Sequence, residues 1–209
     1  MEFISVFNDV LGPVMRGPSS SHTAGGHRIG LIVRSLLNAD EASVRVSFDP
    51  ESSMAPTYRP LGVDLAFTAG LMGWSMLDQR YFNALDRARD AGLSLEFEIA
   101  SLENTDHPNG MLIEAESVGG QPLRVVAEAV GGGGIRIARI NDWPVDIDGK
   151  TGQFLVEVDA ESGAEIAGLL SGPERQVGGG SVLLSAGADA LADQEVVDGI
   201  AGRTGVTRV

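Results

Sequence analysis

Residues 111–140 read MLIEAESVGGQPLRVVAEAVGGGGIRIARI, and this stretch decides the fold class. It contains three β-prone segments, which are Met111 to Val118, Leu123 to Val130 and Ile135 to Ile140. Turn residues join these segments at 119–122 and 131–134. Links this short predict an antiparallel meander, because parallel strands need a long crossover connection.

The residues before the meander predict helices and two more strands. Apolar residues at helical spacing predict a helix from near Thr23 to Leu37, with Ser20 or Ser21 as its N-cap. Further helices are predicted over 61–74 and 77–92, and alternating apolar residues predict strands at 44–48 and 93–99. This order indicates an α+β fold rather than a doubly wound one.

A polar turn at 148–152 separates this part from the C-terminal residues, so we expect one domain at 1–149 and a smaller one at 150–209. The smaller domain is predicted to contain a strand (154–158), a helix (164–170), strand material broken by glycines (177–185), a helix (191–201) and a strand (206–209). This βαββαβ order is that of a small ferredoxin-like module.

The composition is that of a folded chain that repels polyanions. Of the 209 residues, 43% are hydrophobic and 21% are charged, as in ordinary globular proteins. The net charge of -14 opposes binding to phosphate backbones and anionic lipids, so we expect no nucleic acid and no membrane partner. Without an apolar span or a signal peptide, the expected location is cytoplasmic.

The chain has no cysteine, which excludes a cysteine nucleophile and any iron-sulfur cluster or thiolate zinc site held by this chain alone. Its three histidines, His22, His27 and His107, are too few to favour an all-histidine metal site. We therefore expect no metal ligand on this chain, and any cluster must come from another chain.

The densest group of chemically useful residues is Gly17-Pro18-Ser19-Ser20-Ser21-His22-Thr23-Ala24-Gly25. Hydroxyl groups, free backbone N–H groups and the helix dipole meet there, which favours binding of a small anion such as a carboxylate. His22 lies beside them and suits proton transfer near neutral pH. The alternative is a serine-rich N-cap with a surface histidine, and the pattern alone leaves both interpretations open.

A second group, Asp106-His107-Pro108-Asn109-Gly110, is mainly typical of a turn. His27 does not share the i, i+4 spacing of a helical histidine pair with His22, so we expect it on the surface. The glycines at 131–134 lack the Gly-Lys-Ser or Gly-Lys-Thr ending of a phosphate loop and are expected to allow a tight turn or a close approach.

These motifs together resemble the beta chain of iron-sulfur-dependent L-serine dehydratase. The resemblance covers roughly residues 3 to 141 and begins with Ser5-Val6-Phe7 and Gly12-Pro13-Val14-Met15. It continues through Gly17 to Gly25, Arg28-Ile29-Gly30, Ala55, Thr57-Tyr58, Asp64, His107-Pro108-Asn109 and Gly131 to Ile137.

The resemblance implies a fold and a partner. In that family the beta part is similar to the allosteric substrate-binding domain of some phosphoglycerate dehydrogenases, and a C-terminal ACT module often follows it. The tail of this chain resembles a degenerate ACT module, with Asp159 and Gly163 at its first strand-to-helix junction and Ser162 where proline is usual. The family's 4Fe-4S cluster is held by cysteines of an alpha chain, so the resemblance implies that partner and a homo- or hetero-oligomer.

The resemblance also implies an activity, the conversion of L-serine to pyruvate and ammonia. Because the α-proton is weakly acidic and hydroxide leaves poorly, this elimination needs a positioned base and a Lewis acid. The implied substrate-binding residues are Ser19, Ser20, Ser21, Thr23 and Asn109, and the implied catalytic residues are His22 and His107.

One segment departs from the family pattern. Where the family has Gly-His-Gly-Thr-Asp, this chain has Leu61 in place of the histidine and Val63 in place of the threonine, before Asp64. The first hypothesis is a dehydratase beta subunit that is inactive without its alpha chain. The alternatives are a non-catalytic amino-acid-binding regulatory module derived from that family, and a structural interaction domain without a ligand.

Overall fold

A computed structural model describes residues 14–37, 42–103, 107–117, 121–170, 172–187 and 194–209. The first residues of the family resemblance, Ser5 to Pro13, lie outside this range, as do Asp106 and the predicted helix start at Leu191. The chain forms two compact units, residues 1–149 (unit 1) and residues 150–209 (unit 2).

Unit 1 is built on a six-stranded sheet with the order β2-β1-β3-β4-β5-β6. Its strands are β1 (Ala42–Phe48), β2 (Ser94–Ile99), β3 (Gly110–Ser117), β4 (Leu123–Gly131), β5 (Gly134–Ile140) and β6 (Trp143–Ile147). β2 runs parallel to β1, and the other neighbouring strands are antiparallel. The predicted meander is therefore confirmed as β3, β4 and β5.

Strand β6 is absent from the predicted elements. It is short, contains Pro144 and lies at the edge of the sheet. A proline in a β-pattern argues against a central strand, but an edge strand tolerates it because its free side needs no N–H donor. Its pairing with β5 is also irregular, with a register shift between Ile137 and Arg139.

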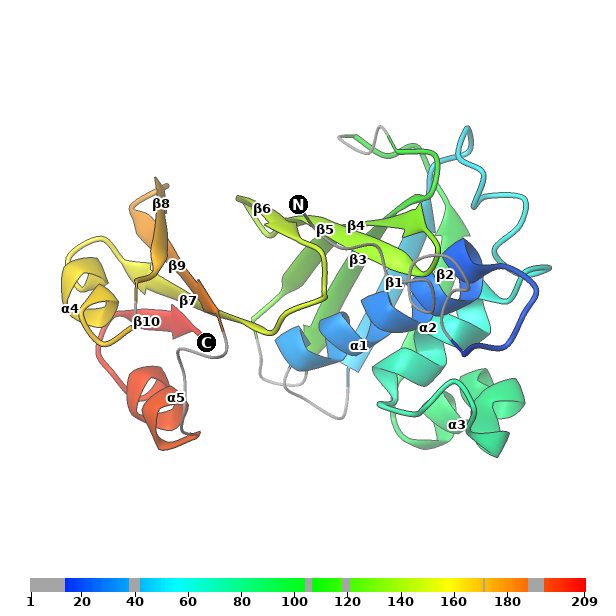
Figure 1. Cartoon of the computed structure of the whole chain (residues 1–209), viewed down its shortest axis with the longest axis horizontal. Coiled ribbons are helices and arrows are strands. Elements are labelled where there is room, and N and C mark those ends of the chain that lie inside the picture. The colour runs from blue at the N-terminus through cyan, green and yellow to red at the C-terminus, as the bar shows by residue number, and fades with distance from the viewer. Residues whose placement is uncertain (1–13, 38–41, 104–106, 118–120, 171, 188–193) are drawn as a thin grey trace. The chain divides into compact units, whose positions relative to one another are not determined.

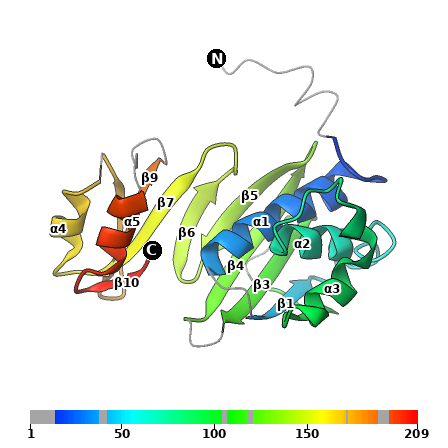
Figure 2. The same ribbon diagram turned by 90° about the horizontal axis from the view of Figure 1, so that it is seen from below.

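Three helices lie on the same face of this sheet (Figures 1 and 2). They are α1 (Gly25–Leu37), α2 (Val63–Leu71) and α3 (Ala84–Asp90). The predicted helix over 77–92 is shorter in the structure, because its first part is the 3-10 helix η3 (Gln79–Asn83) and Leu77 is 57% exposed. Between helices and sheet lies a core that includes Ile29, Phe48, Phe67, Met111, Ile113, Ile135 and Ile137.

Helices α1 and α2 touch through glycines. A Cβ atom on Gly30 would lie 2.2 Å from the carbonyl oxygen of Phe67, and one on Gly70 would lie 2.1 Å from the carbonyl oxygen of His27. At the beginning of both helices, a Cβ on Gly26 would lie 3.4 Å from a methyl of Val63. The two helix N-termini are therefore neighbours.

Unit 2 contains β7 (Gln153–Asp159), α4 (Gly163–Ala167), β8 (Glu174–Gly178), β9 (Ser181–Gly187), α5 (Gln194–Ala201) and β10 (Val206–Arg208). Its antiparallel sheet has the order β10-β7-β9-β8. The sheet packs its own core, which includes Val156, Val158, Ile166, Val182, Leu184 and Ile200. The element order is the predicted βαββαβ, and the mixed helices and sheets of the two units confirm the α+β class.

No helix within the described parts of the chain has both the length and the apolar composition that a membrane crossing requires.

Candidate functional site

The Ser-Ser-Ser-His-Thr segment forms the beginning of the first helix. Ser19 occupies the N-cap position with an extended backbone (φ -131°, ψ 127°), and the single π-helical turn η2 (Ser20–Ala24) leads directly into α1. The prediction of Ser20 or Ser21 as N-cap is therefore wrong. The Ser19 side chain makes no capping hydrogen bond, because its hydroxyl faces His22 instead.

His22 is bound on both ring nitrogens. Its Nδ1 lies 2.9 Å from the Ser19 hydroxyl and 3.1 Å from the Ser21 hydroxyl, and its Nε2 lies 2.9 Å from Oγ1 of Thr57. The residue is only 8% exposed, so the alternative of a surface histidine is wrong. Burial lowers the pKa of His22 below its ordinary value, which favours the neutral imidazole.

The hydrogen-bond network assigns the tautomer of this imidazole. The hydroxyl of Thr57 donates its one proton to the carbonyl oxygen of Ser53. Thr57 must therefore accept from His22, so Nε2 carries the ring proton and Nδ1 is the acceptor. A lone pair of His22 thus faces the hydroxyls of Ser19 and Ser21 at the start of the helix.

The four predicted hydroxyls differ in how they are used. Thr23 is buried and donates to the Ser19 carbonyl oxygen at 2.6 Å, so its hydroxyl positions the turn. The hydroxyls of Ser19 and Ser21 lie 3.2 Å apart and share Nδ1 of His22. Ser20 has no side-chain hydrogen bond to any described residue. All three serines are partly exposed, so an anion can reach them and the N–H groups of the first turn.

The loop before α2, which supplies Thr57 to His22, is hydrogen-bonded to the predicted turn at 107–110. Ser53 receives one hydrogen bond from Thr57, and its own N–H donates to the Pro108 carbonyl oxygen at 2.8 Å. The Ser53 hydroxyl also contacts the side-chain oxygen of Asn109. The amide of Asn109 donates to the Ala129 carbonyl oxygen at 3.3 Å, which anchors the turn to β4.

His107 lies on this turn but not in the His22 network. The Gly110 N–H donates to the His107 carbonyl oxygen at 2.9 Å, which confirms the turn, and Nδ1 of His107 accepts from the Asn109 N–H at 3.1 Å. No hydrogen bond joins the two imidazoles, both of which lie in the described part of the chain. The structure thus brings Ser19, Ser21 and His22 together and links them to Asn109 through residues 53 and 57.

Two residues of this network, Ser53 and Thr57, are absent from the predicted site. They lie in an irregular loop without a periodic pattern, so nothing local marks Thr57 as a polar partner of a histidine 35 positions away, or Ser53 as the acceptor for Thr57. The available signal is the resemblance itself, because Thr57-Tyr58 is among its matching residues.

The segment that departs from the family lies next to the first helical turn. Gly62 has a left-handed backbone (φ 70°), and a Cβ there would lie 4.0 Å from both the Thr23 methyl and the Tyr81 hydroxyl oxygen. That hydroxyl is buried without a hydrogen-bond partner among the described residues. Burial and the nearby Asp64 carboxylate raise the pKa of Tyr81 to about 12, so it remains protonated at neutral pH.

Asp64 lies in the first turn of α2 and is 9% exposed. Its side chain accepts the Leu65 N–H at 2.8 Å. Burial raises the pKa of Asp64, and the Arg59 guanidinium opposes that shift. Asp78, by contrast, is a simple cap that accepts the N–H of Arg80 at 2.8 Å.

His27 is buried, so the surface prediction for it is wrong. It is 8% exposed, and its Nε2 lies 2.7 Å from the Trp74 carbonyl oxygen just after α2. The reason is the glycine contact at Gly70, which brings the two helices close enough to cover a side chain that an isolated helix would leave in water.

The glycines at 131–134 form the turn between β4 and β5, with positive φ angles at Gly131, Gly132 and Gly133. Arg28 of α1 donates to the Gly133 carbonyl oxygen at 2.8 Å and to that of Gly149 at 3.0 Å. The run is therefore a tight turn held by the first helix, as expected.

The donor set of this chain does not fit an iron-sulfur cluster. The sequence has no cysteine, and the described residues contain no group of three histidine, aspartate or glutamate side chains that could hold a metal ion.

Comparisons with known proteins place the chain in a family. No family model matches it. It is 37% identical over 169 residues to the probable L-serine dehydratase beta chain of Bacillus subtilis strain 168, a match that covers 81% of this chain and 74% of that protein. It is 31% identical over 171 residues to the L-serine dehydratase beta chain of Peptoniphilus asaccharolyticus, over 81% of this chain and 76% of that one. The resemblance seen in the sequence is confirmed, and the chain belongs to the family of L-serine dehydratase beta chains.

Proposed function

We propose that this chain is the beta subunit of an L-serine dehydratase that works with a cysteine-bearing alpha chain. Loss of the α-proton and the β-hydroxyl of L-serine, together one water, gives 2-aminoacrylate, which hydrolyses to pyruvate and ammonia. The observation that carries the proposal is the buried imidazole of His22, whose Nδ1 faces partly exposed serine hydroxyls at a helix N-terminus.

In this proposal the beginning of the first helix holds the carboxylate of L-serine. The Ser20 hydroxyl and the N–H groups of the first turn are the available donors. Thr23 holds Ser19 in place through its carbonyl oxygen. Asn109 contributes by fixing the 107–110 turn, since its amide is already bound to β4.

His22 is proposed to orient the serine hydroxyls and to receive a proton through them. Its Nδ1 is an acceptor in the neutral state, and burial keeps that state present at neutral pH. His107 is proposed to reach the substrate from the neighbouring turn, because its ring is only partly buried and is not used by the His22 network.

The 4Fe-4S cluster is proposed to be held entirely by cysteines of the alpha chain, where it would supply the Lewis acid for the leaving hydroxide. This chain lacks suitable ligands, so we propose that it is inactive alone and acts within an oligomer with that chain. A cytoplasmic location remains part of the proposal.

We further propose that unit 1 is the dehydratase beta domain, similar to the allosteric substrate-binding domain of phosphoglycerate dehydrogenase, and that unit 2 is an ACT-like module. The βαββαβ order and the β10-β7-β9-β8 sheet of unit 2 support this assignment. The regulatory alternative is not favoured, because both relatives are named as dehydratase chains.

The test is anaerobic co-expression with the alpha chain, cluster reconstitution and a pyruvate assay on L-serine. His22→Ala and Ser20→Ala should reduce pyruvate formation strongly, and the matched control Ser43→Ala, at an exposed position of β1, should not. Circular dichroism of each variant separates loss of activity from loss of folding. A reconstituted pair that makes no pyruvate, while this chain alone binds L-serine, would establish the regulatory alternative instead.

A further inference from the structure

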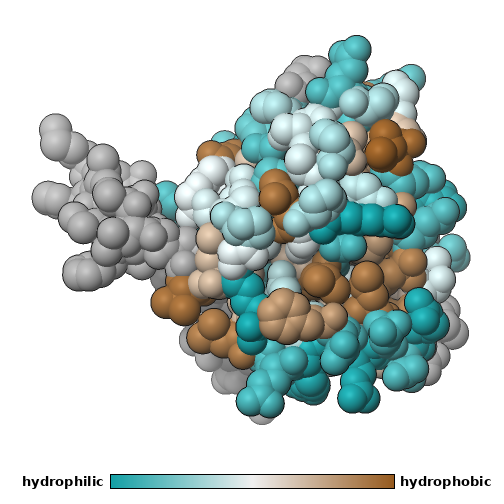
Figure 3. Space-filling view, turned by 90° about the vertical axis from the view of Figure 1, so that its right-hand side faces the viewer, coloured by the Kyte–Doolittle hydropathy of each residue, from teal (hydrophilic) through white to brown (hydrophobic). Residues whose placement is uncertain are grey.

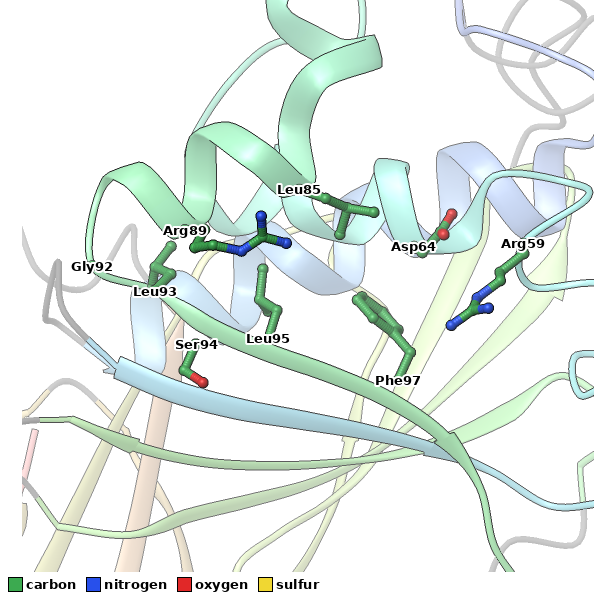
Figure 4. Close-up of a pocket in the computed structure, with 9 residues that line it drawn as sticks. All are labelled: Arg59, Asp64, Leu85, Arg89, Gly92, Leu93, Ser94, Leu95 and Phe97. Carbon is green, nitrogen blue, oxygen red and sulfur yellow. The ribbon is translucent and has the colours of Figure 1, made fainter.

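A cleft of about 590 Å³ lies in unit 1 along β2, the edge strand of the six-stranded sheet (Figure 4). Its walls come from α3 and from the segment that leads into α2. None of the predicted substrate-binding or catalytic residues lines it. Its volume is in the range of pockets that hold small organic molecules.

The floor of this cleft is apolar. Leu95 and Phe97 are two positions apart on β2 and so share one face of the strand, and Leu85 of α3 points toward them in Figure 4. All three are partly exposed. The Phe97 ring is fixed by stacking on Tyr58 at 6.2 Å and by an edge contact with Phe67 at 6.1 Å. On this side of unit 1, Figure 3 shows apolar surface framed by hydrophilic residues.

Two guanidinium groups reach toward this floor from opposite ends (Figure 4). Arg59 lies 5.4 Å above the Tyr58 ring and has no ion pair with any described residue. Arg89 pairs with Asp86 at 3.5 Å, but both side chains are more than 70% exposed, so this pair is weak. In a chain of net charge -14, two such cations beside one cleft with an apolar floor are a specific local feature.

The one acid in the cleft wall does not neutralise these cations by contact. The Asp64 carboxylate accepts the Leu65 N–H and points away from the cleft centre in Figure 4. No ion pair joins it to Arg59, and both residues belong to the described part of the chain. The cleft therefore combines an apolar floor with two guanidinium groups and one carboxylate, and that carboxylate lies within electrostatic reach of Arg59.

We propose that this cleft binds a small organic acid with an apolar body, its carboxylate on Arg59 and its hydrocarbon part on Leu85, Leu95 and Phe97. Arg59 is the chosen partner because the aromatic ring beneath it holds it in place without an ion pair. L-serine lacks the hydrocarbon body that this floor would cover. The site is thus separate from the one at the first helix, and it does not depend on the proposed dehydratase activity.

The test is a titration of the full-length, nitrogen-15-labelled chain with 4-methylpentanoate, followed by amide NMR. We expect saturable shifts at residues 85–97, about tenfold weaker binding of the neutral 4-methylpentanamide, and similarly weak binding of acetate, because each lacks one of the two contacts. Arg59→Gln should weaken binding of the acid about tenfold, while the control Arg124→Gln, at an exposed position of β4, should leave it unchanged.

The spectrum of each variant also reports whether it is folded. Equal binding of the acid and its amide, an undiminished affinity in folded Arg59→Gln, no saturable shift, or shifts confined to Ser19 to His22 would each overturn the proposal. Because the readout is binding to this chain alone, a failed pyruvate assay has no bearing on it.

Discussion

Nε2 of His22 lies 2.9 Å from Oγ1 of Thr57, and this contact determines which nitrogen of the imidazole faces the serines. Thr57 already donates its proton to Ser53, so it accepts from Nε2. The residue that sets the acceptor side of His22 thus belongs to a loop far away in the sequence, and not to the helix that carries the serines.

Thr57→Val tests this relationship. The variant keeps the shape of the side chain but leaves the buried Nε2 proton without an acceptor, which should cost about 1–3 kcal/mol of unfolding free energy. It should also shift the tautomer balance of His22, which nitrogen-15 NMR of the labelled imidazole reports directly. Thr151→Val, at an exposed position, is the control, and an unchanged imidazole spectrum in Thr57→Val would contradict the assignment.

The two buried histidines predict a pH dependence of stability. Burial lowers the pKa of His22 and of His27 below the ordinary value of 6.5. Below that value the unfolded chain binds more protons than the folded one, so stability is fully present above it and falls as the pH drops toward the folded-state pKa. Unfolding free energy should therefore decrease between about pH 7.5 and 5.5.

His27→Gln should make this decrease shallower, since one of the two groups no longer titrates. The raised pKa of Asp64 acts in the opposite direction, and its contribution begins at its ordinary value of 3.8 and extends upward to the folded-state pKa. Urea unfolding at several pH values measures the slope. A slope identical to that of the unchanged chain would show that His27 is not the titrating group.

The contact between α1 and α2 predicts that alanine substitutions at two glycines of α1 have very different effects on stability. Gly30→Ala places a methyl 2.2 Å from a backbone carbonyl oxygen of Phe67, which cannot move aside alone, and should cost about 3 kcal/mol or more. Gly26→Ala meets its nearest atom only at 3.4 Å, so the higher helix propensity of alanine should stabilise it slightly. Thermal unfolding of both variants checks this, and equal effects would refute the close helix packing.

The contact between α1 and α2 also separates what the sequence predicts about the fold from what it does not. The apolar spacing on α1 and the alternation in β3 and β4 are local signals, so these elements and the α+β class follow from them, whereas the edge strand β6 with its Pro144 does not. Burial of His27 does not, because it depends on a second helix approaching through Gly70. The serine segment by itself predicts an anion site, whereas Thr57 becomes a neighbour of His22 only through the tertiary fold.

Tyr81→Phe should raise the unfolding free energy by about 1 kcal/mol, since it removes a buried hydroxyl that has no hydrogen-bond partner among the described residues. Tyr81→Leu should instead destabilise the chain, because it also removes the ring against which Arg16 lies at 5.6 Å. Urea unfolding measures both. Destabilisation by Tyr81→Phe would show that the hydroxyl has a partner, such as a bound molecule next to Gly62.

In unit 2, Gly205 approaches side chains at the end of β7 and in the turn after it. Its φ is +85°, and a Cβ there would lie 2.2 Å from Oδ2 of Asp159 and 2.3 Å from Oγ of Ser162. The Asp159 carboxylate is held in that position by the Ser162 N–H, at 2.7 Å from Oδ1, and this hydrogen bond keeps the pKa of Asp159 low. This carboxylate is thus already engaged by its own chain at the junction where an ACT module would bind an amino acid.

Gly205→Ala should therefore destabilise unit 2 for two reasons, the positive φ, which costs about 1–2 kcal/mol, and the clash with Asp159. Gly180→Ala is a matched control, because that glycine has nearly the same φ, +86°, and no atom within 4 Å of its Cβ position. Hydrogen exchange of β7 and β10 should show the larger loss of protection in Gly205→Ala. If both variants lose the same protection, the backbone angle alone matters and Asp159 is free to turn toward a ligand.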